Sequence, residues 1–143
     1  KIFENIESFI FLLIDYGYSE KEFYLPERSS GTIQFYKNHK KIFESLIDQG
    51  TFDISVSVDF SRILRIIILY KIQLMSYTTQ EQFLLNTNIL ENSLKISDVF
   101  ARNNILKTLL FPTDMGENFK IMILCDRMKN DFLMKFKDYR HKL

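Results

Sequence analysis

The chain has 143 residues, a length typical of one domain with a single sizeable core. Hydrophobic residues make up 46% and charged residues 26%, which excludes an intrinsically disordered protein. The net charge is +1 and there is one cysteine, so an internal disulfide is excluded and a cytoplasmic location is expected.

The first elements are predicted from apolar spacing. Apolar residues recur three and four positions apart over residues 2–16, which predicts an N-terminal helix that Gly17 ends. The apolar run Phe9–Ile14 within it is too short to span a bilayer. Residues 22–26, EFYLP, indicate a short edge strand closed by its proline.

A run of strands is expected next. Residues 32–37, TIQFYK, alternate as a strand and end at a turn at Asn38-His39. Residues 41–48 fit either a helix face or a strand, and we favour the strand because its neighbours need a pairing partner. Residues 51–60, TFDISVSVDF, alternate strictly between apolar and polar side chains. Residues 22–60 are therefore predicted to form a small antiparallel meander.

Helices are predicted for the rest of the chain. Residues 61–75 are apolar almost all round, which favours a buried helix capped by Asp59 or Ser61, with a buried strand as the rival interpretation. Thr78 and Glu81 have the spacing of a capping box before another helical stretch.

The helical pattern continues to the end of the chain. A stripe over residues 90–105 stops at Phe111-Pro112, and Thr113 or Asp114 would cap a long terminal helix. One face of that helix would carry Ile121, Cys125, Met128, Phe132 and Phe136. The fold class is thus α+β, a single domain over residues 1–143: an N-terminal helix, a small antiparallel sheet, then helices packed on one sheet face.

No motif of a catalytic, metal or cofactor site is found. The four glycines stand singly, so there is no glycine-rich phosphate loop. Cys125 lies on an apolar stripe, which indicates a buried structural thiol. His39 and His141 are far apart in the sequence and form no metal-ligand cluster with it. We therefore expect a non-enzymatic protein without a metal or cofactor.

Charge is unevenly distributed, which suggests a binding function. Residues 1–60 carry 6 Lys/Arg against 10 Asp/Glu, whereas residues 127–143 carry 6 against 2. The acidic half would present a sheet face to a basic protein partner, through Glu44, Asp48, Asp53 and Asp59. The alternative is a nucleic-acid-binding protein that uses the basic C-terminal helix, through Lys135, Lys137 and Arg140. A homodimer is also compatible with the sequence.

The first 60 residues resemble a group of small bacterial α+β proteins. The resemblance rests on LLIDYGYSEKEFY, GTIQFYKN and KKIFESLIDQGTFDISVSVDF, in that order. Some members of the group are similar to immunity proteins, which neutralise a toxin by binding it. The resemblance implies a cytoplasmic, immunity-like protein whose partner is a basic toxin.

Overall fold

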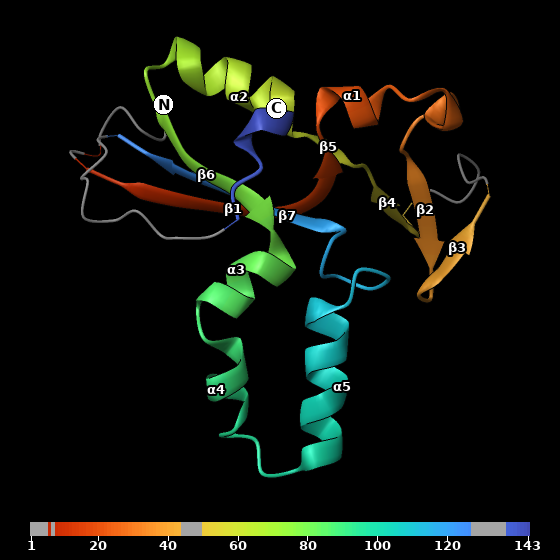
Figure 1. Ribbon diagram of the computed structural model, residues 1–143. Coiled ribbons are helices and arrows are strands. Elements are labelled where there is room, and N and C mark those ends of the chain that lie inside the picture. The colour runs from red at the N-terminus through yellow and green to blue at the C-terminus, as the bar shows by residue number, and fades with distance from the viewer. Residues whose placement is uncertain (1–5, 7, 44–49, 127–136) are drawn as a thin grey trace.

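The computed structural model describes residues 6, 8–43, 50–126 and 137–143. It contains a mixed four-stranded sheet, a separate antiparallel three-stranded sheet and helices (Figure 1). The predicted α+β class and a small antiparallel sheet in the first half of the chain are therefore confirmed. The predicted meander is wrong, because the strand earliest in the sequence lies in the middle of that sheet and pairs with both of the others.

The main sheet has the strand order β5 (Val58–Asp59), β1 (Ile10–Tyr18), β7 (Phe119–Cys125) and β6 (Gln73–Thr79). β1 runs parallel to β5, and the other two pairings are antiparallel. The N-terminal helix predicted over residues 2–16 is wrong, because the structure has the strand β1 there. The predicted long terminal helix is wrong in the same way, because β7 occupies its first part. Strands in the middle of a sheet place apolar side chains on both faces, so such a run also satisfies helical spacing.

The smaller sheet has the order β3 (Lys40–Ile42), β2 (Gln34–Lys37) and β4 (Asp53–Ser55). Asn38 and His39 join β2 to β3 with φ values of 50° and 61°, the left-handed conformation of a tight hairpin turn. The predicted turn is confirmed, as is the strand assignment up to Ile42. Residues 44–49 lie outside the described part of the chain. The single strand predicted over residues 51–60 is divided: β4 belongs to one sheet and β5 to the other.

A helical turn replaces the edge strand predicted over residues 22–26. The structure has α1 (Glu20–Phe23) there, followed by the 3-10 helix η1 (Pro26–Arg28). Glu22 Oε2 accepts hydrogen bonds from both the backbone N–H of Ser19 at 3.1 Å and its hydroxyl at 3.0 Å. This capping arrangement favours a helix start over an extended chain.

One face of the main sheet is covered by α2 (Phe60–Leu69). Asp59 Oδ1 accepts a hydrogen bond from the backbone N–H of Arg62 at 2.9 Å, so the predicted helix and its Asp59 cap are confirmed. The helix stops at Leu69, and the last predicted helical residues join β6 instead. The core on this face consists of Phe60, Ile67, Tyr77, Met122 and Leu124.

The other face carries α3 (Gln80–Asn86), which continues into α4 (Ile89–Ser93) and α5 (Val99–Leu110) as an arm that projects from the sheet (Figure 1). Phe83 of α3 packs against a second core, made of Met75, Ile121, Ile123 and Cys125. Helices therefore lie on both faces, and the prediction of one covered face is wrong. Thr79, one residue later than predicted, caps α3 by accepting from Gln82 N at 3.3 Å.

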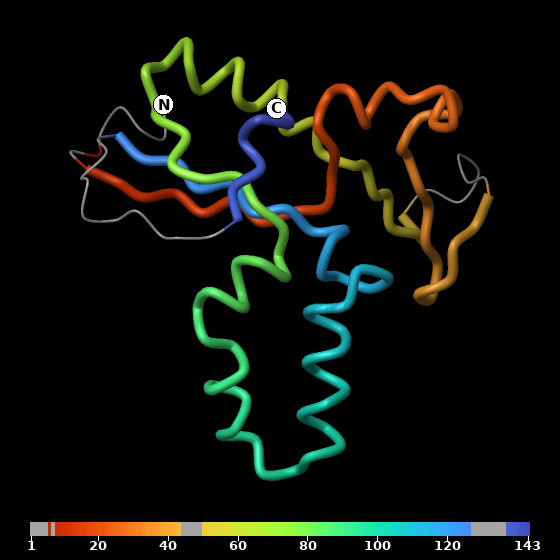
Figure 2. The backbone as a smooth tube through the Cα atoms, viewed as in Figure 1, coloured from red at the N-terminus to blue at the C-terminus, as the bar shows by residue number. Residues whose placement is uncertain are grey.

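The C-terminal residue returns to the start of α2 (Figure 2). Ser61 Oγ donates a hydrogen bond to the Leu143 carbonyl at 3.3 Å. Tyr139 N donates to the Tyr77 carbonyl at 2.7 Å, which holds the same segment against β6. Among the residues that the structure describes, no helix is long and apolar enough to cross a membrane.

Candidate functional site

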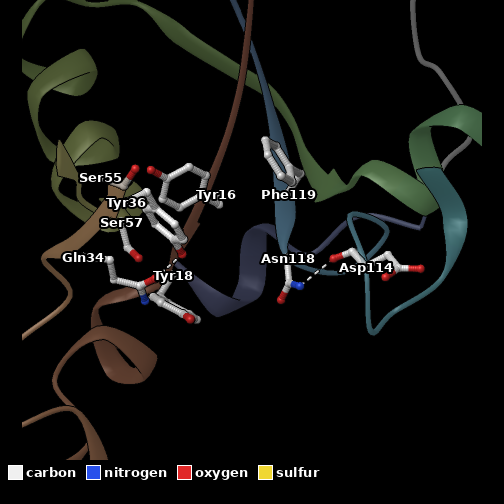
Figure 3. A pocket seen from close by; sticks show the side chains of 10 residues that line it. Tyr16, Tyr18, Gln34, Tyr36, Ser55, Ser57, Asp114, Asn118 and Phe119 are labelled. Carbon is white, nitrogen blue, oxygen red and sulfur yellow. Dashed lines mark hydrogen bonds between the residues drawn. The ribbon is translucent and has the colours of Figure 1, made fainter. Parts of the chain in front are cut away.

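A cavity of about 440 Å³ lies where β1 ends, between the main sheet and the smaller sheet (Figure 3). We call it the β1 pocket. β1 contributes Tyr16, Gly17 and Tyr18 to its lining. The carboxyl end of a strand next to a parallel neighbour is where open α/β sheets bind ligands.

The alternation of β1 directs aromatic side chains to this pocket. Tyr16 is paired across the sheet with Phe119, the first residue of β7. Their rings meet edge to face, with centroids 5.7 Å apart, which is a favourable geometry for an aromatic pair. Two strands that are far apart in the sequence thus build one aromatic wall.

Gly17 allows the main sheet to close beside the pocket. It is paired with Val58 of β5, and a Cβ atom at position 17 would lie 2.2 Å from the Val58 carbonyl oxygen. An atom of the Phe60 ring would lie 2.9 Å from the same Cβ atom. A side chain has no room here, so the approach of β5 to β1 requires glycine.

The smaller sheet forms the opposite wall, with Gln34, Tyr36, Ser55 and the nearby Ser57. Gln34 and Tyr36 are two residues apart on β2, so they share a face. Tyr36 Oη donates a hydrogen bond to Gln34 Oε1 at 2.6 Å, which fixes both side chains at the pocket (Figure 3).

Arg28 holds the third pocket tyrosine in place. Its guanidinium carbon lies 4.0 Å from the ring centroid of Tyr18, a cation–π contact. Arg28 also donates a hydrogen bond to the Glu22 carbonyl. One face of the Tyr18 ring is therefore already occupied by a cation.

The turn before β7 completes the lining with Asp114, Asn118 and Phe119. Asn118 Nδ2 donates to the Asp114 carbonyl at 2.5 Å. Gly116 packs between them against the end of α5, where a Cβ atom would lie 2.1 Å from the Leu110 carbonyl oxygen. The close packing of this turn positions one carboxylate and one amide at the pocket.

A second, smaller cavity of about 130 Å³ lies on the α2 side of the sheet. Tyr77 lines it and is 2% exposed, and its hydroxyl has no hydrogen-bond partner within the described part of the chain. Burial, with a smaller contribution from Glu22, raises the pKa of Tyr77 well above its usual value. Tyr77 is therefore a neutral hydroxyl at physiological pH. Burial also lowers the pKa of Lys120, whose ammonium donates a hydrogen bond to the Glu117 carbonyl.

Only two of the four predicted partner-binding carboxylates, Asp53 and Asp59, lie in the described part of the chain. Asp53 lies on β4 of the smaller sheet, at an open cavity that His39 also lines. Asp59 caps the N-terminus of α2, where its carboxylate accepts the hydrogen bond from Arg62 N. Glu44 and Asp48 lie outside the described residues, so the set as a whole stays untested.

The alternative nucleic-acid residues are also only partly described. Lys135 lies outside the described residues, and Lys137 precedes the short 3-10 helix η3 (Arg140–Lys142). The Lys137 carbonyl accepts from Thr78 Oγ1 at 2.7 Å, and Arg140 Nε lies 2.5 Å from Asp138 Oδ2. A long basic helix is absent from the described C-terminal residues, 137–143.

Cys125 is buried, as predicted. Burial, and secondarily Asp126, raises the pKa of its thiol, which suits a structural side chain. No group of three or more His, Cys, Asp or Glu side chains that could hold a metal occurs in the described ranges.

Residues 1–78 match the model of a family described as "Putative S-adenosyl-L-methionine-dependent methyltransferase". The match covers more than half of the chain. The chain belongs to this family. The predicted non-enzymatic binding function, and the resemblance to immunity-like proteins, are therefore wrong. The strand and turn pattern on which that resemblance rested, LLIDYGY to SVSVDF, lies entirely within the methyltransferase match.

Two solved structures from Burkholderia thailandensis are similar to this member of the methyltransferase family. One is an uncharacterised protein, with 28% identity and a TM-score of 0.83 over 94% of this chain and 37% of its own. The other is described as a "likely methyl transferase" bound to S-adenosyl-homocysteine, with 28% identity and a TM-score of 0.82 over 94% of this chain and 36% of its own. The chain thus spans little more than a third of the length of either protein. No curated protein matches it.

Sequence reasoning missed the residues of the β1 pocket. They come from four separated segments, and none of these segments carries a catalytic motif of its own. The usable signal was local: two tyrosines flank Gly17 directly after the apolar run of β1, which is typical of a strand end at a ligand site.

Proposed function

We propose that this chain forms one side of the active site of an S-adenosyl-L-methionine-dependent methyltransferase, and that the β1 pocket is its binding site. One observation carries the proposal: every pocket residue up to Ser57 lies within the residues that match the methyltransferase family. The position of the pocket at the carboxyl end of β1 supports it, because α/β enzymes bind ligands there.

The pocket residues fit the chemical groups of S-adenosyl-L-methionine. The rings of Tyr16, Tyr36 and Phe119 offer faces on which a purine stacks or a positively charged sulfur rests. The Tyr18 ring already has the Arg28 guanidinium over one face, so it offers only its other face to a ligand. The amides of Gln34 and Asn118 suit ribose hydroxyls, and the Asp114 carboxylate suits an amino group.

The role of this chain is binding and orientation. S-adenosyl-L-methionine supplies an activated methyl group when it is bound. The Tyr16–Phe119 and Tyr36–Gln34 contacts hold the pocket side chains in fixed positions, which lowers the entropic cost of binding and aligning a ligand. The four glycines of the chain stand singly, so a glycine-rich binding loop would come from elsewhere in such an enzyme.

The test is a titration of the full chain with S-adenosyl-homocysteine, followed residue by residue by NMR. We expect shifts at the pocket residues of β1, β2 and the turn before β7. The substitution Tyr36→Leu removes the aromatic ring from the smaller-sheet side of the pocket and is expected to weaken binding at least about tenfold. Tyr70→Leu, at an exposed tyrosine at the end of α2, is the matched control. Shifts confined to another surface, or equal affinities for the two variants, would remove the β1 pocket from the proposal.

A further inference from the structure

The smaller cavity on the α2 side of the sheet is separate from the β1 pocket. Tyr77, Thr79 and Lys120 of the sheet line it. Thr79 and Lys120 are paired across β6 and β7, and Tyr77 is two residues before Thr79 on β6, so the three side chains share one face of the sheet. Phe119, the residue before Lys120, lines the β1 pocket instead. β7 thus directs two successive side chains to two different cavities.

Two polar groups in this cavity lack a partner of opposite character. The Tyr77 side chain is 2% exposed, and its hydroxyl has no hydrogen-bond partner in the part of the chain that the structure describes. The ammonium of the partly buried Lys120 donates to the Glu117 carbonyl, but it forms no ion pair with any described residue. Burying a hydroxyl or a cation without such a partner is unfavourable, so both groups would gain from an acceptor placed between them.

Charged side chains of both signs line the rest of the cavity, namely Glu22, Glu117 and Lys142. Burial lowers the pKa of Lys120, Glu22 and Glu117 oppose this effect, and Lys142 adds to it. The pKa stays lowered, so the two carboxylates do not fully offset the cost of burying this cation. One further negative charge in the cavity would offset more of it.

We infer that this cavity is a second ligand site, which binds a small monocarboxylate. An ionised carboxylate only accepts hydrogen bonds, so its oxygens can accept from the Tyr77 hydroxyl and from the Lys120 ammonium. A single negative charge suits the site better than two, because Glu22 and Glu117 would repel a dianion such as sulfate. The cavity volume of about 130 Å³ admits only a few non-hydrogen atoms, since one water takes about 30 Å³ in the liquid.

The test is a titration of the 143-residue chain with sodium acetate, followed by NMR, with sodium chloride added to keep the ionic strength constant. We expect chemical shift changes at Tyr77, Thr79 and Lys120. Bound acetate should also raise the pKa of Lys120, because a nearby negative charge favours the ammonium form. Methyl acetate, which lacks the charge, should cause no such changes, and sulfate should bind more weakly than acetate.

Three substitutions test the donors. Tyr77→Phe removes the hydroxyl and keeps the ring, and it is expected to weaken acetate binding at least about threefold. Lys120→Met removes the buried charge and is expected to weaken it at least about tenfold. Lys107→Gln, at an exposed lysine of α5, is the matched control and would leave the affinity unchanged. Tyr77→Phe is the more conservative change, so it keeps the inference testable if Lys120→Met does not fold.

Four results would overturn the inference: no shifts at these residues with acetate, equal shifts with methyl acetate, tighter binding of sulfate, or wild-type affinity in a folded Tyr77→Phe or Lys120→Met protein. None of these measurements needs a methyl donor. Failure of S-adenosyl-homocysteine to bind at the β1 pocket would therefore count against the proposed function and not against the carboxylate site.

Discussion

Gly17 of β1 lies directly against the carbonyl oxygen of Val58, at a distance that leaves no room for a Cβ atom. Gly17→Ala is therefore expected to push β5 away from β1 and to lower the free energy of unfolding by at least about 2 kcal/mol. Urea denaturation of both proteins measures the change. Gly31→Ala is the comparison: it meets no atom within 4 Å but has a φ of 82°, so we expect a smaller loss of about 1 kcal/mol. Equal losses would contradict a steric role for Gly17.

Tyr77 carries a buried hydroxyl that no described residue pairs with, and Thr78 carries one that is paired. Tyr77→Phe removes a desolvated polar atom, so the free energy of unfolding should stay unchanged or rise by about 1 kcal/mol. Thr78→Val removes the hydrogen bond to the Lys137 carbonyl and should lower it by about 1 kcal/mol. Thermal unfolding of the two variants decides the point, and a destabilised Tyr77→Phe protein would show that the hydroxyl has a partner in solution.

Cys125 should react slowly with a thiol reagent while the protein is folded. Its side chain is buried, and burial raises the pKa of the thiol, so little thiolate is available near pH 8. Ellman's reagent should label it only as fast as the protein opens, and at full speed in denaturant. Rapid labelling of the native chain would mean that β7 is open to solvent at its end.

Glu20 and Arg65 tie the first turn of α1 to α2. Arg65 donates two hydrogen bonds to the Glu20 carboxylate, at 2.8 Å and 3.1 Å. The hydrogen bond from Arg65 lowers the pKa of Glu20 below its usual value of 4.5. A carboxylate with a lowered pKa in the folded state stabilises the protein above its unfolded pKa, and this contribution is lost as the pH falls through the folded value.

Glu20→Gln should therefore reduce the loss of stability between pH 7 and pH 3. Because the pair is exposed, the effect should be small and should shrink in high salt. Urea midpoints at the two pH values measure it, with Glu27→Gln in the neighbouring η1 as the control. An unchanged pH profile for Glu20→Gln would contradict the coupling between α1 and α2.

Local signals in the sequence predicted local structure well. The Asp59 cap located the start of α2, and Asn38-His39 located a hairpin turn, because both depend on neighbouring backbone groups. β1 and β7 were predicted as helices, because a strand buried on both faces loses the alternation that identifies it. Beyond the two tyrosines that flank Gly17, the β1 pocket could not be predicted, because Tyr16, Tyr36 and Asn118 come together only when distant segments fold against one another.

Two residues, Val56 and Ser57, separate β4 of the smaller sheet from β5 of the main sheet. The two walls of the β1 pocket are thus joined by one of the shortest connections in the chain. Most loops accept insertions and deletions between homologues. Here a single added or lost residue would shift Ser57 out of the pocket and change the face that the next strand presents. The length of this connection should therefore be among the most constrained features of the protein, even if the identity of Val56 is not.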